Sequence, residues 1–403
     1  GYSSAASDVY KRQIINNVDA TANINSGIKN IYLSDDTSYY HNSVDNYGTL
    51  IINESKIYGK INNTENLKIN NSKIYSNNLS GDNNSTISNI GNLTIEGSEI
   101  YGNDNHGIYN KSGTVNVTQS VIQNHNSGGD AIYNVSGEIT LVNSSLLAGR
   151  EYGSGIVNYG VVTFESGKIK GLYSGVMNYG SFTMKDGKIE DGKYSLISED
   201  INSVTNIYGG EINSNKNFSR ILAEHGIVNI YSGKIYAYGN NATAIRIINS
   251  DVTVNLGVKG DKDINEQLIV SKTNPTVYGT TQGIVNQENG IFNFYDGRII
   301  AQSAIVGNIN EIEDGYSIVG EIQEDGTEIK YLDKNPIIKN LTTSKKYISL
   351  STAVNEASSG DVLQYISTST VLSTEETVEI VSGKEITIDI NGNSCLLYTS
   401  PSP

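Results

Sequence analysis

The chain has 403 residues, of which 37% are hydrophobic, and a formal net charge of −15. This acidic balance argues against nucleic acid as a partner, because binding to phosphates requires basic patches. The only cysteine is Cys395, which excludes a disulfide-rich scaffold. No apolar run approaches the ~18 residues that a membrane-spanning helix needs.

The two ends of the chain differ from the rest. Residues 1–13 and 395–403 resemble translated adapter sequence from DNA libraries, read through in frame on each side. Segments of this kind are left out of fold reasoning. The resemblance implies a metagenomic fragment in which residues 14–394 are an internal piece of a longer protein and Cys395 is not native. Residues 14–47 are weakly patterned, and we expect partial coils there.

A repeated phrase begins at Gly48. It consists of a Gly, an apolar-x-apolar pair, a few polar residues and a closing Ile, as in Gly48–Ile57, Gly113–Ile122 and Gly226–Ile235. The closing apolar residue recurs nine times between Ile57 and Ile235, so the mean step is about 22 residues, as in solenoid proteins. The alternation of apolar and polar residues inside each copy is the pattern of a strand with one buried face.

This step predicts a parallel β-helix. At ~3.3 Å per residue, about 22 residues accommodate three short strands and their turns, and each coil would pair with the next at ~4.8 Å. Residues 48–307 are therefore predicted to form about ten coils.

A second phrase lies between copies of the first and ends in Asn. Its side chain is expected at a corner between strands, where it can hydrogen-bond the Asn of the next coil and form a ladder. The alternative is a turn asparagine without a ladder. The predicted ladder residues are Asn110, Asn134, Asn158, Asn178 and Asn286.

Together the phrases Gly113-Thr-Val-Asn-Val and Gly107-Ile-Tyr-Asn resemble the pectate-lyase-like repeats of large, adhesin-like bacterial surface proteins. The resemblance covers roughly residues 48–307. It implies an all-β, right-handed parallel β-helix and an extracellular, cell-surface location. It does not decide the activity, since such scaffolds carry both enzymes and binding proteins.

The pattern changes after residue 307. Alternating runs flank Asp325-Gly326, which is a hairpin signal, so residues 308–335 are predicted to form a small β-cap on the last coil. Residues 336–394 are predicted to open a second β-helix module. A short amphipathic helix over Ser349–Gly360, with Gly360 as its C-cap, is expected there.

Three strands are expected after that helix, at Val362–Ile366, Val378–Ile380 and Ile386–Ile390.

One set of loops holds candidate catalytic residues. In three successive coils the loop after the closing apolar residue carries ionisable side chains, which stacking would bring into one patch. Carboxylates with His can perform acid–base chemistry, and an Arg can bind an acidic sugar. The alternative is ordinary polar loops. The candidates are Asp104, His106, His125, Asp130, Arg150 and Glu151.

Tyrosines provide the candidate binding residues. Tyr58, Tyr75, Tyr101 and Tyr236 directly follow the closing Ile. On one sheet face they would form a discontinuous stripe, and exposed tyrosines bind sugars or proteins. The alternative is a stabilising ladder of stacked side chains.

The favoured function is a non-enzymatic, monomeric surface module for display or binding of host or microbial glycans or surface proteins, without cofactor or metal. The first alternative is a polysaccharide lyase or glycoside hydrolase that uses the loops from Asp104 to Glu151. The second alternative is a structural stalk. A close carboxylate pair in a groove would favour the enzyme, and an aromatic-lined sheet would favour binding.

Overall fold

The computed structural model describes residues 14–25, 30–32, 44–76, 85–102, 106–125, 128–149, 152–264, 266, 268–367 and 378–391. The adapter-like ends lie outside these residues. The chain divides into two compact units. The first holds the strands up to Ile312 together with Gly320–Tyr331, and the second holds Glu313–Val319 and the residues from Leu332 onward.

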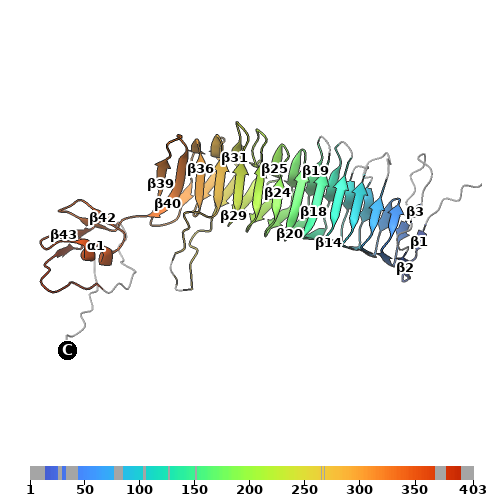
Figure 1. The fold of residues 1–403 in the computed structure, drawn as a ribbon, viewed down its shortest axis with the longest axis horizontal. Coiled ribbons are helices and arrows are strands. Elements are labelled where there is room, and N and C mark those ends of the chain that lie inside the picture. The colour runs from blue at the N-terminus through green and yellow to red at the C-terminus, as the bar shows by residue number, and fades with distance from the viewer. Residues whose placement is uncertain are drawn as a thin grey trace, which may run out of the picture. The chain divides into compact units, whose positions relative to one another are not determined.

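The first unit is a right-handed parallel β-helix (Figure 1). Each coil contributes one strand to each of three parallel sheets, here named sheet A, sheet B and sheet C. Sheets A and B each contain 13 strands among the described residues, so the solenoid has about 13 turns rather than ten. The predicted fold class is confirmed, and the predicted number of coils is too low.

Sheet A consists of β1 (Ile14–Asn16), β4 (Val44–Asn46), β7 (Ile61–Asn63), β10 (Ser85–Asn89), β13 (His106–Asn110), β16 (Asp130–Asn134), β19 (Ser154–Asn158), β22 (Ser174–Asn178), β25 (Tyr194–Ser198), β28 (Ile221–Ala223), β31 (Thr243–Ile247), β34 (Gln282–Asn286) and β37 (Ser303–Val306).

Sheet B consists of β2 (Thr21–Asn25), β5 (Thr49–Asn53), β8 (Asn66–Asn70), β11 (Asn92–Glu96), β14 (Thr114–Thr118), β17 (Glu138–Val142), β20 (Val161–Phe164), β23 (Ser181–Met184), β26 (Val204–Ile207), β29 (Gly226–Ile230), β32 (Val252–Leu256), β35 (Ile291–Phe294) and β38 (Glu311–Ile312).

Sheet C consists of β3 (Asn30–Tyr32), β6 (Lys56–Tyr58), β9 (Lys73–Tyr75), β12 (Glu99–Gly102), β15 (Val121–Asn124), β18 (Ser144–Ala148), β21 (Gly167–Gly171), β24 (Lys188–Glu190), β27 (Glu211–Ser214), β30 (Lys234–Ala237), β33 (Thr276–Gly279) and β36 (Arg298–Ala301), followed by β40 (Glu328–Lys334) and β39 (Tyr316–Ile322).

Two features explain the low coil count from sequence. Residues 14–32 hold a full set of three strands, in register with β4, β5 and β6, although the repeated phrase is weak there. Coils also differ in length: Val44 pairs with Ile61 after only 17 residues. The long insertion at residues 257–275, between β32 and β33, acts in the opposite direction, because it lengthens a single coil.

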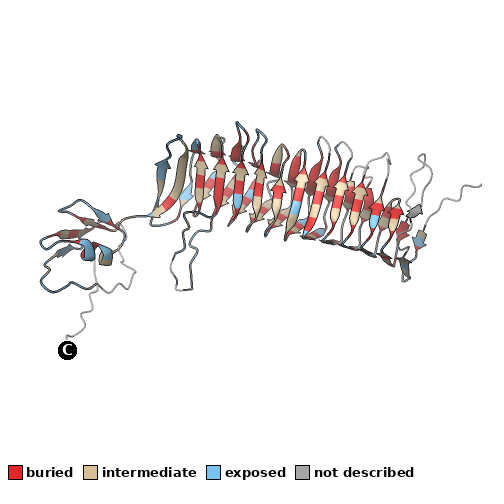
Figure 2. Cartoon of the chain, in the orientation of Figure 1, coloured by how far each residue is buried: buried red, intermediate tan, exposed pale blue. Residues whose placement is uncertain are grey.

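The core is a set of stacked columns of like residues. The closing residues Ile74, Ile100 and Ile122 pair in register and are fully buried. Figure 2 shows the alternation of buried and more exposed residues along the strands. Burial of an Ile side chain contributes ~1.5–3 kcal/mol, so the column of closing residues is a main source of stability. Four of the five phenylalanines also lie in this core: Phe164, Phe182, Phe292 and Phe294.

An asparagine ladder runs along the A–B corner, where the strands of sheet A end. Nδ2 of Asn110 donates to Oδ1 of Asn134 at 2.9 Å, Asn134 donates to Asn158 at 2.8 Å, and Asn158 donates to Asn178 at 2.9 Å. The same chain of bonds extends toward the N-terminus through Asn89, Asn63, Asn46 and Asn16.

Asn286 is not part of this ladder. Its register neighbour in the preceding coil is Ile247, and its amide donates to the carbonyl oxygens of Gly290 and Asn308. The ladder ends at Asn178, because the next residue in register is Ser198.

A serine ladder, which the sequence analysis missed, runs along the B–C corner. The backbone N–H of each serine donates to Oγ of the serine in the next coil, at 3.0–3.3 Å. The residue before each serine has a positive φ. The ladder comprises Ser55, Ser72, Ser98, Ser120 and Ser144.

A hairpin follows the last coil. β40 pairs antiparallel with β36, at the end of sheet C, and β39 follows it in the sheet order. Gly326 in the predicted Asp325-Gly326 turn has φ +84°, and Asp325 accepts a hydrogen bond from the backbone of Thr327. β40 therefore covers the sheet C edge, which would otherwise present unpaired backbone groups.

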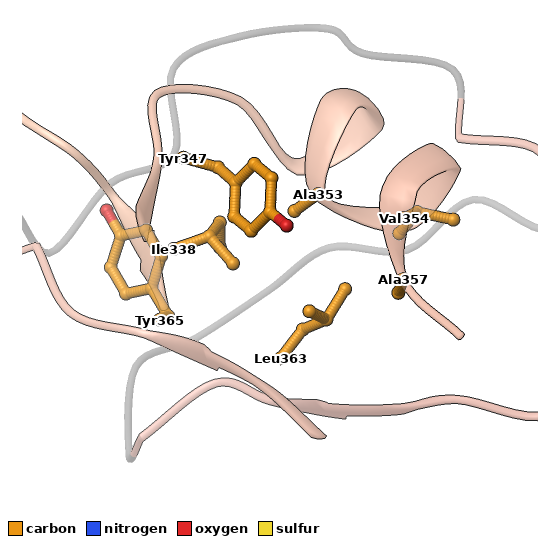
Figure 3. Close-up of a cluster of buried hydrophobic side chains, with 7 residues drawn as sticks. All are labelled: Ile338, Tyr347, Ala353, Val354, Ala357, Leu363 and Tyr365. Carbon is orange, nitrogen blue, oxygen red and sulfur yellow. The ribbon is translucent and has the colours of Figure 1, made fainter. Parts of the chain in front are cut away.

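The second unit is a small sheet with one helix. The sheet contains β41 (Ile338–Asn340), β42 (Lys346–Tyr347), β43 (Val362–Tyr365) and β44 (Thr387–Asp389) in the order β42-β41-β43-β44. With α1 (Leu350–Glu356) it encloses an apolar core (Figure 3).

Two predictions for the second unit need correction. The helix ends at Glu356 rather than near Gly360, because Ala357 is extended and Oδ2 of Asp361 accepts from the backbone N–H of Ser358. Val378–Ile380 is not a strand, although Val378 packs against the core.

Candidate functional site

The predicted catalytic residues are only partly described. Asp104, Arg150 and Glu151 lie outside the described residues. His125 is exposed just beyond β15. The structure places His106 and Asp130 side by side at the start of β13 and β16, in direct register.

The His106–Asp130 pair is nearly buried, with side-chain exposures of 11% and 8%. Nδ1 of His106 lies 3.1 Å from Oδ2 of Asp130, without the alignment of a hydrogen bond. The other carboxylate oxygen of Asp130 accepts from the backbone N–H of Ser154 at 2.9 Å. Burial raises the pKa of Asp130, and the nearby His106 opposes this shift. Both side chains thus belong to a polar column within sheet A. The column continues from Ser154 to Ser174, whose hydroxyl donates a hydrogen bond to the hydroxyl of Ser154.

Tyr58, Tyr75 and Tyr101 form a stacked ladder on sheet C. The ring centroids lie 5.0 and 4.8 Å apart with interplanar angles of 17° and 2°. The rings therefore cover each other's faces. A sugar ring would contact mainly the edges of these rings. The hydroxyl of Tyr101 also donates to Glu99, which is the main reason that its pKa rises to about 12.

Tyr236 is separated from this ladder by five coils. Its ring contacts Tyr238 and Tyr278 instead, at 5.6 and 6.1 Å. The intervening positions of the same column hold Gln123, Leu147, Lys170, Glu190 and Asn213.

A second aromatic group, which the sequence analysis did not single out, lies beside the asparagine ladder. Tyr159 and Tyr179 stack at 4.3 Å and 7°, and Tyr133 contacts Tyr159 at 5.8 Å. Burial is the main cause of the raised pKa of Tyr133 and Tyr179. The sequence signal was visible, because Asn-Tyr-Gly occurs at 158–160 and 178–180, as it does at 46–48.

The most distinctive aromatic group lies at the C–A corner, where the chain passes from sheet C to sheet A. Tyr173, Tyr194 and Phe218 come from three successive coils and are here named the corner cluster. The ring centroids of Tyr173 and Tyr194 lie 6.1 Å apart, with an interplanar angle of 76°. Those of Tyr194 and Phe218 lie 5.8 Å apart, with an angle of 63°. Phe218 is 44% exposed, whereas the other four phenylalanines are fully buried. In each coil the aromatic residue directly precedes a serine, a signal that could have been read from the sequence.

A lysine ammonium group lies over all three rings of the corner cluster. Nζ of Lys193 is 5.8 Å from the ring centroid of Tyr173, 5.2 Å from that of Tyr194 and 5.0 Å from that of Phe218. These distances are within the ~6 Å range of cation–π attraction. The near-perpendicular rings do not cover each other's faces, unlike the parallel rings of the sheet C ladder.

A tight turn places Lys193 beside these rings. Asp191 and Gly192 both have positive φ, 58° and 80°. A Cβ on Gly192 would lie 2.6 Å from the carbonyl oxygens of Gly171 and Tyr194. Only glycine fits this approach without a backbone shift, so Gly192 sets the path of the chain into the corner cluster.

A buried arginine supports the corner cluster from inside. The corresponding position is small in most coils, but here it is Arg220, which is fully buried. Its Nη2 donates to the carbonyl oxygens of Lys193, Lys216 and Phe218. Burial lowers the pKa of Arg220 to about 10, and Asp191 opposes the shift. The small residues at this position in other coils are Gly107, Ala131, Gly155, Gly175, Ser195, Ala244, Gly283 and Ala304.

Among the described residues, no group of three or more His, Cys, Asp or Glu side chains is arranged to hold a metal ion. No helix in the described part of the chain is long and apolar enough to cross a membrane. Comparisons with protein-family models, curated proteins and solved structures find no match to this chain.

Proposed function

We propose that this protein is an extracellular, cell-surface binding module that takes extended glycan or protein ligands on the corner cluster and performs no catalysis. The observation that carries the proposal is a group of three non-parallel rings from successive coils at one corner of the solenoid, with Phe218 exposed and Tyr173 and Tyr194 partly exposed. Exposed aromatic side chains give large contact area at little conformational cost. Because successive coils follow the solenoid axis, a ligand lying along the axis would meet each ring in turn.

Two comparisons within the chain favour the corner cluster over other candidates. The sheet C tyrosines are occupied with each other, since their faces stack at 4.8–5.0 Å. The His106–Asp130 pair is nearly buried and fixed to the backbone of Ser154, which suits a structural role better than contact with a polymer. The location rests on the resemblance of the repeated phrases to those of bacterial surface proteins.

The test is a glycan and surface-polymer array probed with the full chain and with Tyr194→Ala. We expect binding by the wild type and loss of most of it in the variant. Tyr208→Ala is the matched control, since Tyr208 is 51% exposed and stacks on Tyr231 elsewhere on the solenoid. Equal binding by Tyr194→Ala and the wild type would contradict the proposal.

A further inference from the structure

The position of Lys193 indicates which kind of chemical group the corner cluster binds. An ammonium group of the chain already lies over all three rings, at 5.0–5.8 Å from their centroids. Another lysine, Lys56, lies over Tyr58 and Tyr75, but those two rings are nearly parallel. Aromatic faces carry partial negative charge and attract cations. The corner cluster is therefore arranged for a positive group rather than for a neutral ring alone.

From this geometry we infer that the corner cluster binds an alkylated ammonium group of the ligand, and that Lys193 occupies the place when no ligand is bound. The inference rests on the proposed function, because the same surface takes the polymer. The ligand class is a polymer bearing trimethylammonium or a similar substituent.

An alkylated ammonium has a physical advantage over the lysine that it replaces. A lysine ammonium is compact and strongly hydrated, so resting against aromatic rings costs it part of its hydration. Methyl groups on nitrogen weaken that hydration and also fill the space between the rings, and such ions are favoured ligands of aromatic cages. Lys193 is only half-buried, so its side chain is free to leave toward solvent.

Charge favours the same class of ligand. The chain has a net charge of −15, which attracts cations and repels anionic polymers at low ionic strength. Asp191, two residues before Lys193, is paired with Lys170. The preference for a cationic ligand therefore comes from the aromatic rings and from the negative electrostatic potential of the whole chain. It does not come from a carboxylate inside the corner cluster.

The test titrates the full chain with choline and with 3,3-dimethylbutan-1-ol, its uncharged carbon isostere, by calorimetry or ligand-observed NMR. For a small ion we expect a Kd on the order of 1 mM. In Lys193→Ala, which removes the competing ammonium, choline binding should become about 5–10-fold tighter, or ~1–1.4 kcal/mol. In Lys193→Ala combined with Tyr194→Ala it should be lost. Lys56→Ala is the control and should leave choline binding unchanged.

Three outcomes would overturn the inference: equal binding of the isostere, no gain in Lys193→Ala, or a gain of the same size in Lys56→Ala. The Lys193→Ala variant changes a half-exposed side chain and leaves the rings in place, so it remains informative even where Tyr194→Ala fails to fold, which circular dichroism detects. Polymer binding that depends on Tyr194 but is insensitive to choline would sink the inference and leave the proposed function standing. Choline binding by a protein that binds no polymer on the array would support the inference about the ammonium site and contradict the proposed function.

Discussion

The buried Arg220 binds the carbonyl oxygen of Lys193 from inside the solenoid, with Nη2 at 3.4 Å. The same nitrogen binds the carbonyl oxygen of Phe218. One internal cation thus fixes the backbone of two residues whose side chains meet on the surface. This links the packing of the core to the shape of the corner cluster.

Replacing Arg220 by Ala should destabilise the protein by about 2–4 kcal/mol, because three backbone carbonyls lose a charged donor and a cavity remains. The same variant should weaken choline binding in the Lys193→Ala background. Thermal unfolding and calorimetry provide the measurements. Arg246→Ala, at a half-buried position in β31, is the control and should change stability by less than ~1 kcal/mol. A stable Arg220→Ala protein with intact binding would show that Arg220 does not position the corner cluster.

Replacing Asn134 by Ala should cost about 2–4 kcal/mol of unfolding free energy, because Asn110, Asn158 and Gly137 all lose a partner in a buried place. Asn293→Ala is the comparison. Asn293 lies at the end of a half-exposed row and donates to Asn255, and its loss should cost under ~1 kcal/mol. Urea denaturation distinguishes the two. Equal costs would mean that the interior ladder contributes no more than a surface bond.

The two carboxylate oxygens of Asp130 have different roles, which two variants separate. Asp130→Asn keeps an acceptor for the backbone N–H of Ser154 and removes a buried charge, so its stability at neutral pH should stay within ~1 kcal/mol of the wild type or exceed it. Asp130→Ala leaves that N–H unpaired and should cost about 1–3 kcal/mol. Guanidinium unfolding measures both. A large loss in Asp130→Asn would show that the contact of the carboxylate with His106 contributes more to stability than the bond to Ser154.

Tyr101 provides a pH-dependent test. Its hydrogen bond to Glu99 raises its pKa from 10.0 to about 12, so the folded state holds the proton more tightly than the unfolded state. The resulting stability is fully present below about pH 10 and is lost as the pH rises through about 12. In Glu99→Gln the pKa of Tyr101 should fall toward 10. NMR of ring-labelled tyrosine, with the signal assigned by Tyr101→Phe, measures the shift. No change in Glu99→Gln would show that the carboxylate is not its main cause.

The sequence predicted the fold well, because the closing Ile of the phrase fills one column in coil after coil. The predicted coil number was too low because residues 14–32, where the repeated phrase is weak, form a further coil and because the coils are of unequal length. The asparagine ladder could be inferred from a fixed phrase, but its end at Asn178 depends on Ser198 standing next in register.

The corner cluster was harder to find. Tyr173, Tyr194 and Phe218 lie in corners of different length, so no constant spacing marks them. The role of Arg220 follows only from its place inside the solenoid, because a lone arginine in the sequence reads as a surface charge. Ladders of like residues recur in successive coils and can therefore be predicted from the repeated phrase. The corner cluster lies where the repeat varies from coil to coil, so the phrase does not predict it.

Hydrogen–deuterium exchange with and without the tightest polymer from the array tests the central claim most directly. Binding at the corner cluster predicts added protection in residues 171–195 and 213–221, and little change around the sheet C ladder or the His106–Asp130 pair. Protection confined to either of those two places, with the corner cluster unaffected, would contradict the proposed binding surface.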